Sequence, residues 1–206
     1  IDQQRIHVIP LGINRFDTNS EKPISAPAKP YFLFVGVIKP RKNVLGVVKA
    51  FAEFKKSDAD SFHLIIAGKE GAEYQRKIEE FIIAENLTNW VAILNHVSDY
   101  GLSALYRNAE ALVFPSLWEG WGLPVLEAFA AGVPVITSNR SGTKEAAGDA
   151  ALLVDPENFQ DIAAGMKEIL KPDIRKQLIE KGRRRALEFS WEKSAKKYLE
   201  LFKSIK

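Results

Sequence analysis

The sequence predicts an α/β protein: a Rossmann-like parallel sheet flanked by helices, with a helical tail over residues 158–206. Compact apolar runs alternate with segments whose apolar residues recur at helical spacing. This alternation is typical of parallel strands joined by helices. Beyond residue 158 the pattern is helical only. The chain has 206 residues, enough for one sizeable core, and we expect a single domain over residues 1–206.

The expected strands are six short apolar runs that suit strands buried on both faces. They are YFLFVG (31–36), FHLIIAG (62–68), WVAIL (90–94), ALVF (111–114), PVITS (134–138) and ALLVD (151–155). Helices are expected from Asn43, over residues 72–86, over residues 99–108 behind a Ser98 cap, and over residues 123–132. In the tail one apolar stripe must pack on something, and it consists of Trp191, Ala195, Tyr198, Phe202 and Ile205.

Composition excludes several classes of protein. The net charge of +3 and the scattered basic residues argue against a nucleic-acid-binding protein. Without cysteine there are no disulfides or thiolate metal sites, and a reducing compartment fits. No apolar run approaches the ~20 residues that cross a bilayer, so we expect a cytoplasmic protein. The run KGRRR (181–185) is typical of a solvated helix face; contact with anionic lipid at the periphery of a membrane is the alternative.

The segment EGWGLPVLEAFAAGVPVI (119–136) combines a glycine-rich turn with two glutamates. Ligands of doubly wound folds bind where strands end and helices begin. Gly120 and Gly122 would let backbone amides approach a ligand, and the following helix dipole favours an anion such as phosphate. Glu127, one turn into that helix, could accept hydrogen bonds from a diol, while Glu119 faces a second polar group. The alternative is an ordinary strand-turn-helix corner with solvated glutamates.

Residues 114–156, FPSLWEGWGLPVLEAFAAGVPVITSNRSGTKEAAGDAALLVDP, closely resemble the signature of retaining, nucleotide-sugar-dependent glycosyltransferases of family four, also called group 1. The resemblance extends through IHVIPLGINRF (6–16), FVGVIKPRKN (34–43) and NHVSDYGLSALYRNAEALVFPS (95–116), and covers essentially the whole chain. Such enzymes have two Rossmann-like lobes, the GT-B fold, with a Glu-x7-Glu element in the second lobe. The resemblance therefore implies the C-terminal, donor-binding lobe.

The resemblance also implies roles for individual residues. The second glutamate of the element, Glu127, would hold the ribose hydroxyls. The first, Glu119, would lie beside the donor sugar and is the catalytic candidate. Backbone amides of Gly122 and Leu123 would reach the sugar or its phosphate, and Lys42 would contact the diphosphate. A fixed cation and a helix dipole can stabilise a departing nucleoside diphosphate, so we expect neither a metal nor a cofactor.

One position departs from the pattern of the family. Many members have arginine directly after the loop glycine, where it forms a second clamp on the phosphates. In this chain the glycine of the loop that resembles the family's phosphate-binding loop is Gly36, a further donor-site candidate, and it is followed by Val37. Either Arg41 or Lys39 replaces that arginine, or one clamp is missing; of the two, Arg41 is the candidate for the donor site.

The side chains at positions 96, 97, 118 and 121 do not identify the nucleobase or define the sugar pocket. In relatives the base is held by main-chain groups around the positions of His96 and Val97, so the identity of the base stays open. For the imidazole of His96 a structural role at a strand end is the favoured interpretation. Trp118 and Trp121 flank Glu119, and shaping of the sugar pocket or simple packing are equally acceptable for them.

The resemblance further implies that the N-terminal acceptor lobe is absent from this chain. We therefore expect a domain that binds a nucleotide sugar (GDP-, UDP- or ADP-linked) but does not transfer the sugar alone. The P-R-K-N loop favours GDP-mannose. In relatives the last helix often crosses onto the first lobe, so the stripe from Trp191 to Ile205 could be partly uncovered here, which favours self-association.

The sequence disfavours three alternatives to the transferase. A non-catalytic sugar-nucleotide-binding or scaffold domain is disfavoured because Glu119, Glu127 and Lys42 are all present. A nucleotide-sugar epimerase fits the acidic pair less well. A dehydrogenase would require G-x-G-x-x-G after its first strand, which GVIKPRKN (36–43) does not supply.

Overall fold

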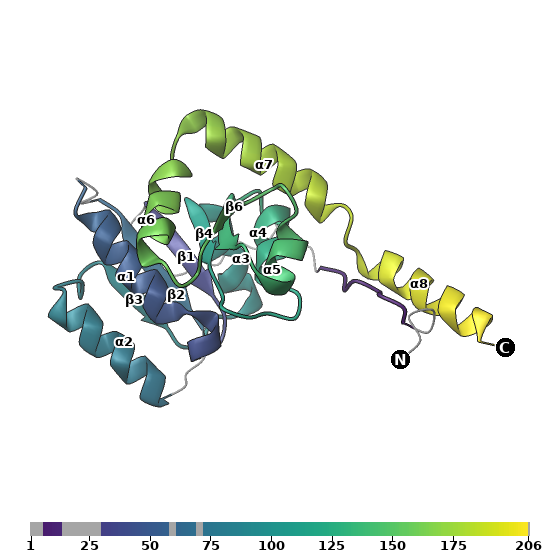
Figure 1. Cartoon of the computed structure of the whole chain (residues 1–206), viewed down its shortest axis with the longest axis horizontal. Coiled ribbons are helices and arrows are strands. Elements are labelled where there is room, and N and C mark those ends of the chain that lie inside the picture. The colour runs from purple at the N-terminus through teal and green to yellow at the C-terminus, as the bar shows by residue number, and fades with distance from the viewer. Residues whose placement is uncertain (1–5, 14–29, 58–60, 69–71, 206) are drawn as a thin grey trace.

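The computed structural model describes residues 6–13, 30–57, 61–68 and 72–205 of the chain (Figure 1). Its centre is a six-stranded sheet in the order β3-β2-β1-β4-β5-β6, and every neighbouring pair is parallel. The strands are β1 (Tyr31–Val35), β2 (His63–Ala67), β3 (Val91–Leu94), β4 (Ala111–Phe114), β5 (Val135–Ser138) and β6 (Leu152–Val154). All six coincide with the predicted apolar runs, so the Rossmann-like prediction is confirmed.

Helices follow the strands in alternation. They are the 3-10 helix η2 (Pro40–Lys42) and the α-helices α1 (Val44–Lys55), α2 (Ala72–Ala84), α3 (Asp99–Asn108), α4 (Leu123–Ala130), α5 (Ser141–Ala147), α6 (Phe159–Glu168), α7 (Pro172–Ala186) and α8 (Trp191–Ser204). The predicted cap of α3 is present, because Oγ of Ser98 accepts a hydrogen bond of 3.1 Å from the amide of Gly101. Neither η2 nor α5 was predicted.

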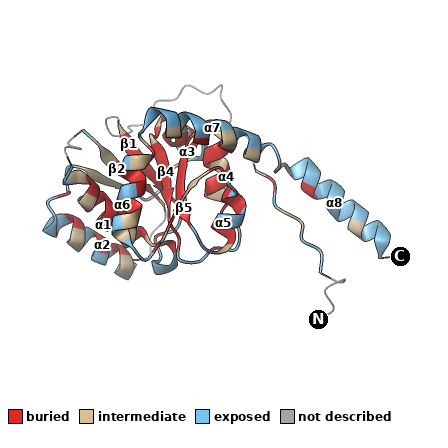
Figure 2. Ribbon diagram, turned by 45° about the horizontal axis from the view of Figure 1, so that its top comes forward, coloured by how far each residue is buried: buried red, intermediate tan, exposed pale blue. Residues whose placement is uncertain are grey.

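The two halves of the sheet are wound in opposite directions. The crossover from β1 through α1 leads to β2 on one side, and the crossover from β4 through α4 leads to β5 on the other. Because such crossovers are right-handed, α1 and α4 cover opposite faces. The helices α2 and α6 pack against α1, whereas α5 and α7 pack against α4 (Figure 2). The central strands β1, β4 and β5 are buried along their whole length.

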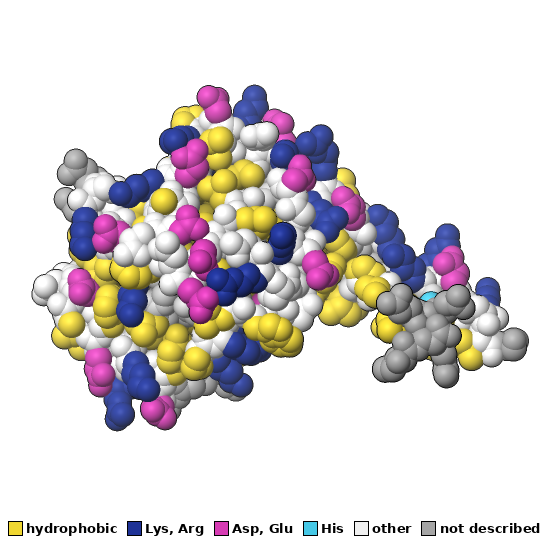
Figure 3. Space-filling model, in the orientation of Figure 1, with side chains coloured by type: hydrophobic (Ala, Val, Ile, Leu, Met, Phe, Trp, Pro, Cys, Tyr) yellow, Lys and Arg dark blue, Asp and Glu magenta, His cyan; other side chains and the backbone are white. Residues whose placement is uncertain are grey.

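The tail consists of a packed helix and a projecting helix. On α7, Arg185 donates hydrogen bonds to the carbonyls of Glu145 and Ala146, and Lys181 pairs with Asp149 at 2.9 Å, so these two basic residues fasten α7 to the end of α5. Other basic side chains of α7 and α8 alternate with acidic ones on the surface (Figure 3). Within the described part of the chain, no helix has the length and apolar content needed to span a membrane.

Helix α8 extends away from the domain (Figure 1), and its Ser194 hydroxyl donates a hydrogen bond of 2.6 Å to the carbonyl of Pro10. The apolar stripe on α8 is largely exposed: 47% for Trp191 and 64% for Phe202. In the described part of the chain, Tyr198, Phe202 and Ile205 of this stripe therefore remain largely exposed to solvent. An exposed apolar stripe of this size is available for contact with another surface.

Candidate functional site

The sheet has one topological switch point, between β1 and β4, where the chain order reverses. Loops that leave the carboxyl ends of two such strands diverge to opposite faces, which opens a crevice between them. The β1–α1 loop contains residues 36–43, and the β4–α4 loop contains residues 115–122. Seven of the nine predicted site residues lie on these two loops or in the first turns of α4, and the other two follow β3.

A carboxylate lies between two cations where these two loops meet. Nζ of Lys42 forms an ion pair with Oε1 of Glu119, and Nη1 of Arg41 lies 3.4 Å from Oε2 of the same carboxylate. Lys42 and Glu119 are each only 9% exposed. Burial of a single unpaired charge is costly, so these residues stabilise one another. The ammonium of Lys42 also lies 5.0 Å from the centre of the Phe114 ring. The structure thus brings three of the predicted residues together.

The backbone of Glu119 is held by the start of α5. Its amide donates a hydrogen bond of 3.1 Å to Oγ of Ser141, and its carbonyl accepts one of 3.1 Å from the amide of Gly142. On the other side, the amide of Leu117 donates to the carbonyl of Arg41 at 2.9 Å. The β4–α4 loop is therefore fixed to both of its neighbours. Ser141 was not among the site residues predicted from the sequence.

Gly122 occupies the position before α4 and has φ 99° and ψ 49°, in the left-handed region that favours glycine. A Cβ there would also approach Cγ2 of Thr143 to 3.2 Å. Because Gly122 has no side chain, it cannot accept hydrogen bonds from the first backbone amides of α4 as an ordinary N-cap residue does. The first of these amides is that of Leu123. Such a helix start can bind an anion. A Cβ on Gly120, by contrast, would meet nothing within 4 Å.

Glu127 lies one turn into α4 and faces α3. The hydroxyl of Tyr106, which is fully buried, donates a hydrogen bond of 2.9 Å to Oε2 of Glu127. Burial raises the pKa of Glu127, and the nearby charge of Asp99 raises it further, while the hydrogen bond from Tyr106 opposes both effects. Burial and the adjacent carboxylate raise the pKa of Tyr106 well above its usual value. Tyr106 was not among the site residues predicted from the sequence.

The remaining predicted residues lie around this cluster. Gly36 directly follows β1, has φ 145°, and its amide donates a hydrogen bond of 2.9 Å to the carbonyl of Ala67. His96 is exposed and Val97 is half-buried, between the edge strand β3 and α3. In the described part of the structure neither forms a hydrogen bond or an ion pair with the buried Lys42–Glu119 pair.

Trp118 and Trp121, which flank Glu119 in the sequence, differ in their surroundings. Trp121 packs edge-to-face on Phe189, with 5.4 Å between ring centres, which is a packing role. Trp118 is 62% exposed, and its carbonyl lies 3.5 Å from Nη1 of Arg41. Across the described ranges, no three histidine, aspartate or glutamate side chains gather as metal ligands would.

The doubly wound sheet and the position of this cluster place the chain among Rossmann-like domains with a site at the topological switch point. More narrowly, the chain belongs to the family Glycosyl transferases group 1, whose model matches residues 15–185. Its recognition as a family-four domain with one GT-B lobe is confirmed.

Two curated relatives are similar over most of this chain. O-antigen chain mannosyltransferase B of Escherichia coli is 33% identical over 176 residues, which cover 85% of this chain and 46% of the relative. O-antigen chain mannosyltransferase RfbU of Salmonella typhimurium is 33% identical over 169 residues, 82% of this chain and 45% of the relative. The chain therefore spans about half the length of these relatives.

A solved structure supports the same conclusion. Sucrose-phosphate synthase from Thermosynechococcus elongatus superposes with a TM-score of 0.82 at 28% identity, over 97% of this chain and 52% of the other. The similarity includes nearly all of the fold described above.

Proposed function

We propose that this chain is the donor-binding part of a retaining glycosyltransferase. It binds a nucleoside-diphosphate sugar at the switch point and, together with an acceptor-binding lobe, transfers the sugar to an acceptor hydroxyl. The observation that carries the proposal is the convergence of Lys42, Arg41 and Glu119, from two loops far apart in sequence, beside the N-terminus of α4.

The cations suit the leaving group. In sugar transfer the bond between the anomeric carbon and the phosphate oxygen breaks, and negative charge develops on the nucleoside diphosphate. Lys42, Arg41 and the dipole of α4 stabilise that charge without a metal ion. Arg41 takes the place of the arginine that relatives have at the position of Val37, since its guanidinium already lies at the buried carboxylate.

The carboxylates suit the two sugars of the donor. Oε1 of Glu119 is buried and, apart from its ion pair, accepts no hydrogen bond among the described residues. When Lys42 turns toward the diphosphate, this oxygen becomes an acceptor for a hydroxyl of the transferred sugar. Glu127, with one oxygen held by Tyr106, accepts hydrogen bonds from the ribose hydroxyls. The nucleobase is held by main-chain groups near His96 and Val97.

GDP-mannose is the donor that we propose. The names of the two curated relatives, both mannosyltransferases at 33% identity, support mannose as the sugar. The loop sequence P-R-K-N (40–43) supports the same donor. The family resemblance supports retention: the new bond forms on the face from which the phosphate leaves, and the acceptor proton passes to that phosphate.

Transfer requires residues outside this chain in our proposal, because its curated relatives are about twice as long. The chain alone would then bind the donor without turning it over. Incubation with GDP-mannose and a panel of hydroxyl acceptors tests this point. Release of GDP with formation of a mannosylated product would contradict it.

The binding proposal is tested by calorimetric titration with GDP, UDP and ADP. We expect GDP to bind, and Glu127→Ala to weaken that binding by about 1–3 kcal/mol, the cost of leaving hydrogen-bonding groups unpaired. Glu180→Ala, at an exposed carboxylate on α7, is the matched control and should bind like the unmodified chain. Absence of binding by all three nucleotides would overturn the proposal and favour a scaffold domain.

A further inference from the structure

Asn43 follows Lys42 directly and adopts an unusual backbone conformation. Its φ of 59° and ψ of 33° lie in the left-handed region, which asparagine and glycine adopt more readily than other residues. The chain turns here from η2, which carries Arg41 and Lys42, into α1. This backbone conformation favours asparagine or glycine at position 43, but it does not explain the contacts that the side chain makes.

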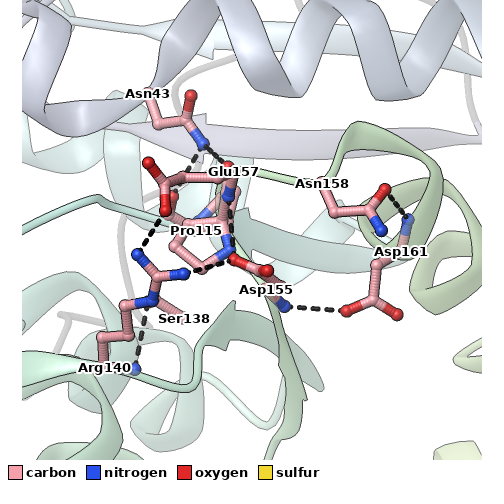
Figure 4. A network of polar contacts seen from close by, with 9 residues as sticks. Asn43, Pro115, Ser138, Arg140, Asp155, Glu157, Asn158 and Asp161 are labelled. Carbon is pink, nitrogen blue, oxygen red and sulfur yellow. Dashed lines mark hydrogen bonds and ion pairs between the residues drawn. The ribbon is translucent and has the colours of Figure 1, made fainter.

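The side chain of Asn43 does not cap α1. An asparagine before a helix normally accepts a hydrogen bond from the first turn, yet the amide of Leu45 donates to the hydroxyl of Tyr74 instead, at 3.2 Å. Nδ2 of Asn43 donates to two carbonyls of other loops, Pro115 at 3.0 Å and Pro156 at 2.6 Å (Figure 4). A Cβ at Gly46 would collide with the Asn43 side chain, so that glycine leaves room for this arrangement.

One of these carbonyls belongs to a turn that is fixed from several sides. Pro156 lies between β6 and α6, and Arg140 bridges its neighbours Asp155 and Glu157 at 2.8 and 2.6 Å. The carboxylate of Asp161 accepts a hydrogen bond of 2.7 Å from the amide of Asp155 (Figure 4). The side-chain amide is therefore tied to a rigid point of the sheet edge rather than to a loose loop.

The other carbonyl opens the loop that carries Glu119. Pro115 directly follows β4, and further contacts join this loop to the β1–α1 loop. They include the hydrogen bond from the amide of Leu117 to the carbonyl of Arg41 and the ion pairs of Lys42 and Arg41 with Glu119. The hydrogen bond of Asn43 and these contacts together set the relative position of the two loops.

We propose that Asn43 is a positioning residue for the donor site. By joining the β1–α1 loop to the loops after β4 and β6, it fixes Lys42 relative to Glu119, so that one ligand meets the cation at its diphosphate and the carboxylate at its sugar. The functional part of this inference rests on the proposed function, in which Lys42 contacts the diphosphate.

The variant Asn43→Gly separates the side chain from the backbone, because glycine keeps the left-handed conformation and loses both hydrogen bonds. Asn86→Gly is the matched control: Asn86 is also left-handed, with φ 57°, but is exposed and follows α2. The probes are the nucleoside diphosphate that binds in the titration above and its monophosphate. We expect Asn43→Gly to lower the diphosphate affinity about tenfold, the monophosphate affinity far less, and Asn86→Gly to lower neither.

A second measurement asks whether the effect passes through Lys42. If Asn43 acts by placing that ammonium, Asn43→Gly should cause no further loss of diphosphate affinity in a Lys42→Ala background. An undiminished loss in that background, or equal losses for the diphosphate and monophosphate, would show that Asn43 supports the fold only. Unchanged affinity in the single variant would also overturn the inference.

Hydrogen exchange tests the role of Asn43 without any ligand, and therefore independently of the proposed function. The amide of Leu117 reports on the junction of the two loops, because its hydrogen bond crosses between them. In hydrogen exchange we expect faster exchange at Leu117 in Asn43→Gly, with unchanged protection in β1 and no change in Asn86→Gly. If no nucleotide binds, the proposed function fails, and exchange at Leu117 alone decides whether Asn43 joins the loops; unchanged exchange refutes it.

Discussion

The hydroxyl of Tyr106 on α3 donates a hydrogen bond of 2.9 Å to Oε2 of Glu127 on α4. Tyr106 is fully buried and Glu127 is half-buried, and burial raises the pKa of each. The phenol therefore stays protonated and acts as a donor throughout the neutral range. One oxygen of the carboxylate is thus held by the protein at the helix that opens onto the switch point.

The raised pKa of Glu127 makes stability depend on pH. Because the folded-state pKa lies above that of the unfolded chain, the folded protein binds more protons between the two values. The contribution of Glu127 to stability is full below the unfolded pKa and is lost as pH rises through the folded pKa. In Glu127→Gln this dependence should disappear. Urea unfolding from acidic to neutral pH measures it, and an identical pH profile in the variant would contradict the assignment.

Tyr106→Phe keeps the buried ring and removes the donor. We expect a loss of stability of about 1 kcal/mol and weaker nucleotide binding, because the carboxylate of Glu127 is no longer held in place. The binding loss should vanish for a 2′,3′-dideoxynucleotide, which lacks the hydroxyls that Glu127 would bind. Calorimetry with both nucleotides makes the comparison. An equal loss for the two would mean that Tyr106 acts through the fold rather than through the ribose contact.

Substitutions in the Lys42–Glu119 pair should affect folding stability and nucleotide binding differently. Lys42→Met should destabilise the chain by about 3 kcal/mol, because it leaves a nearly buried carboxylate with Arg41 as its only cationic partner among the described residues. Adding Glu119→Gln removes the charge and should restore most of the stability. Nucleotide binding should stay weak in both variants. Chemical denaturation and calorimetry test these expectations together, and recovery of binding in the double variant would show that Lys42 does not contact the diphosphate.

The glycine turn offers a matched pair of substitutions. Gly122→Ala should lower stability by about 1–2 kcal/mol, because φ is 99° and the new methyl approaches Thr143. Gly120→Ala adds its methyl to open space and should leave stability nearly unchanged. Thermal unfolding of both variants measures the difference. Similar losses at the two positions would argue against a conformational requirement at Gly122.

The exposed stripe of α8 predicts self-association. Phe202 is 64% exposed on this stripe, and Tyr198 and Ile205 are exposed beside it. We expect the apparent mass in sedimentation experiments to rise with concentration, and Phe202→Glu to reduce that rise by placing a charge on the apolar surface. Lys203→Glu, on the same helix outside the stripe, is the control. A concentration-independent monomer would refute the prediction.

Most of the fold was predictable from the sequence because it depends on periodicity. Each strand is a continuous apolar run, and the helices that cover the sheet repeat their apolar residues at helical spacing. Helix α5 was not predicted, since SGTKEAA (141–147) has no such pattern. It buries small residues, including Gly142 and Ala146, and its start bonds the backbone of Glu119. A helix of this kind is set by its surroundings.

The candidate site, like the fold, was predicted only in part from the sequence. Periodicity in the sequence predicted the order of strands and helices, the glycine-rich turn indicated Glu119 and Glu127, and family resemblance added Lys42. The ion pair between Lys42 and Glu119, and the hydrogen bonds by which Asn43 joins three loops, became visible only in the folded chain. Periodicity and turn chemistry act between near neighbours, whereas these contacts exist only after the sheet has brought distant strand ends to one edge.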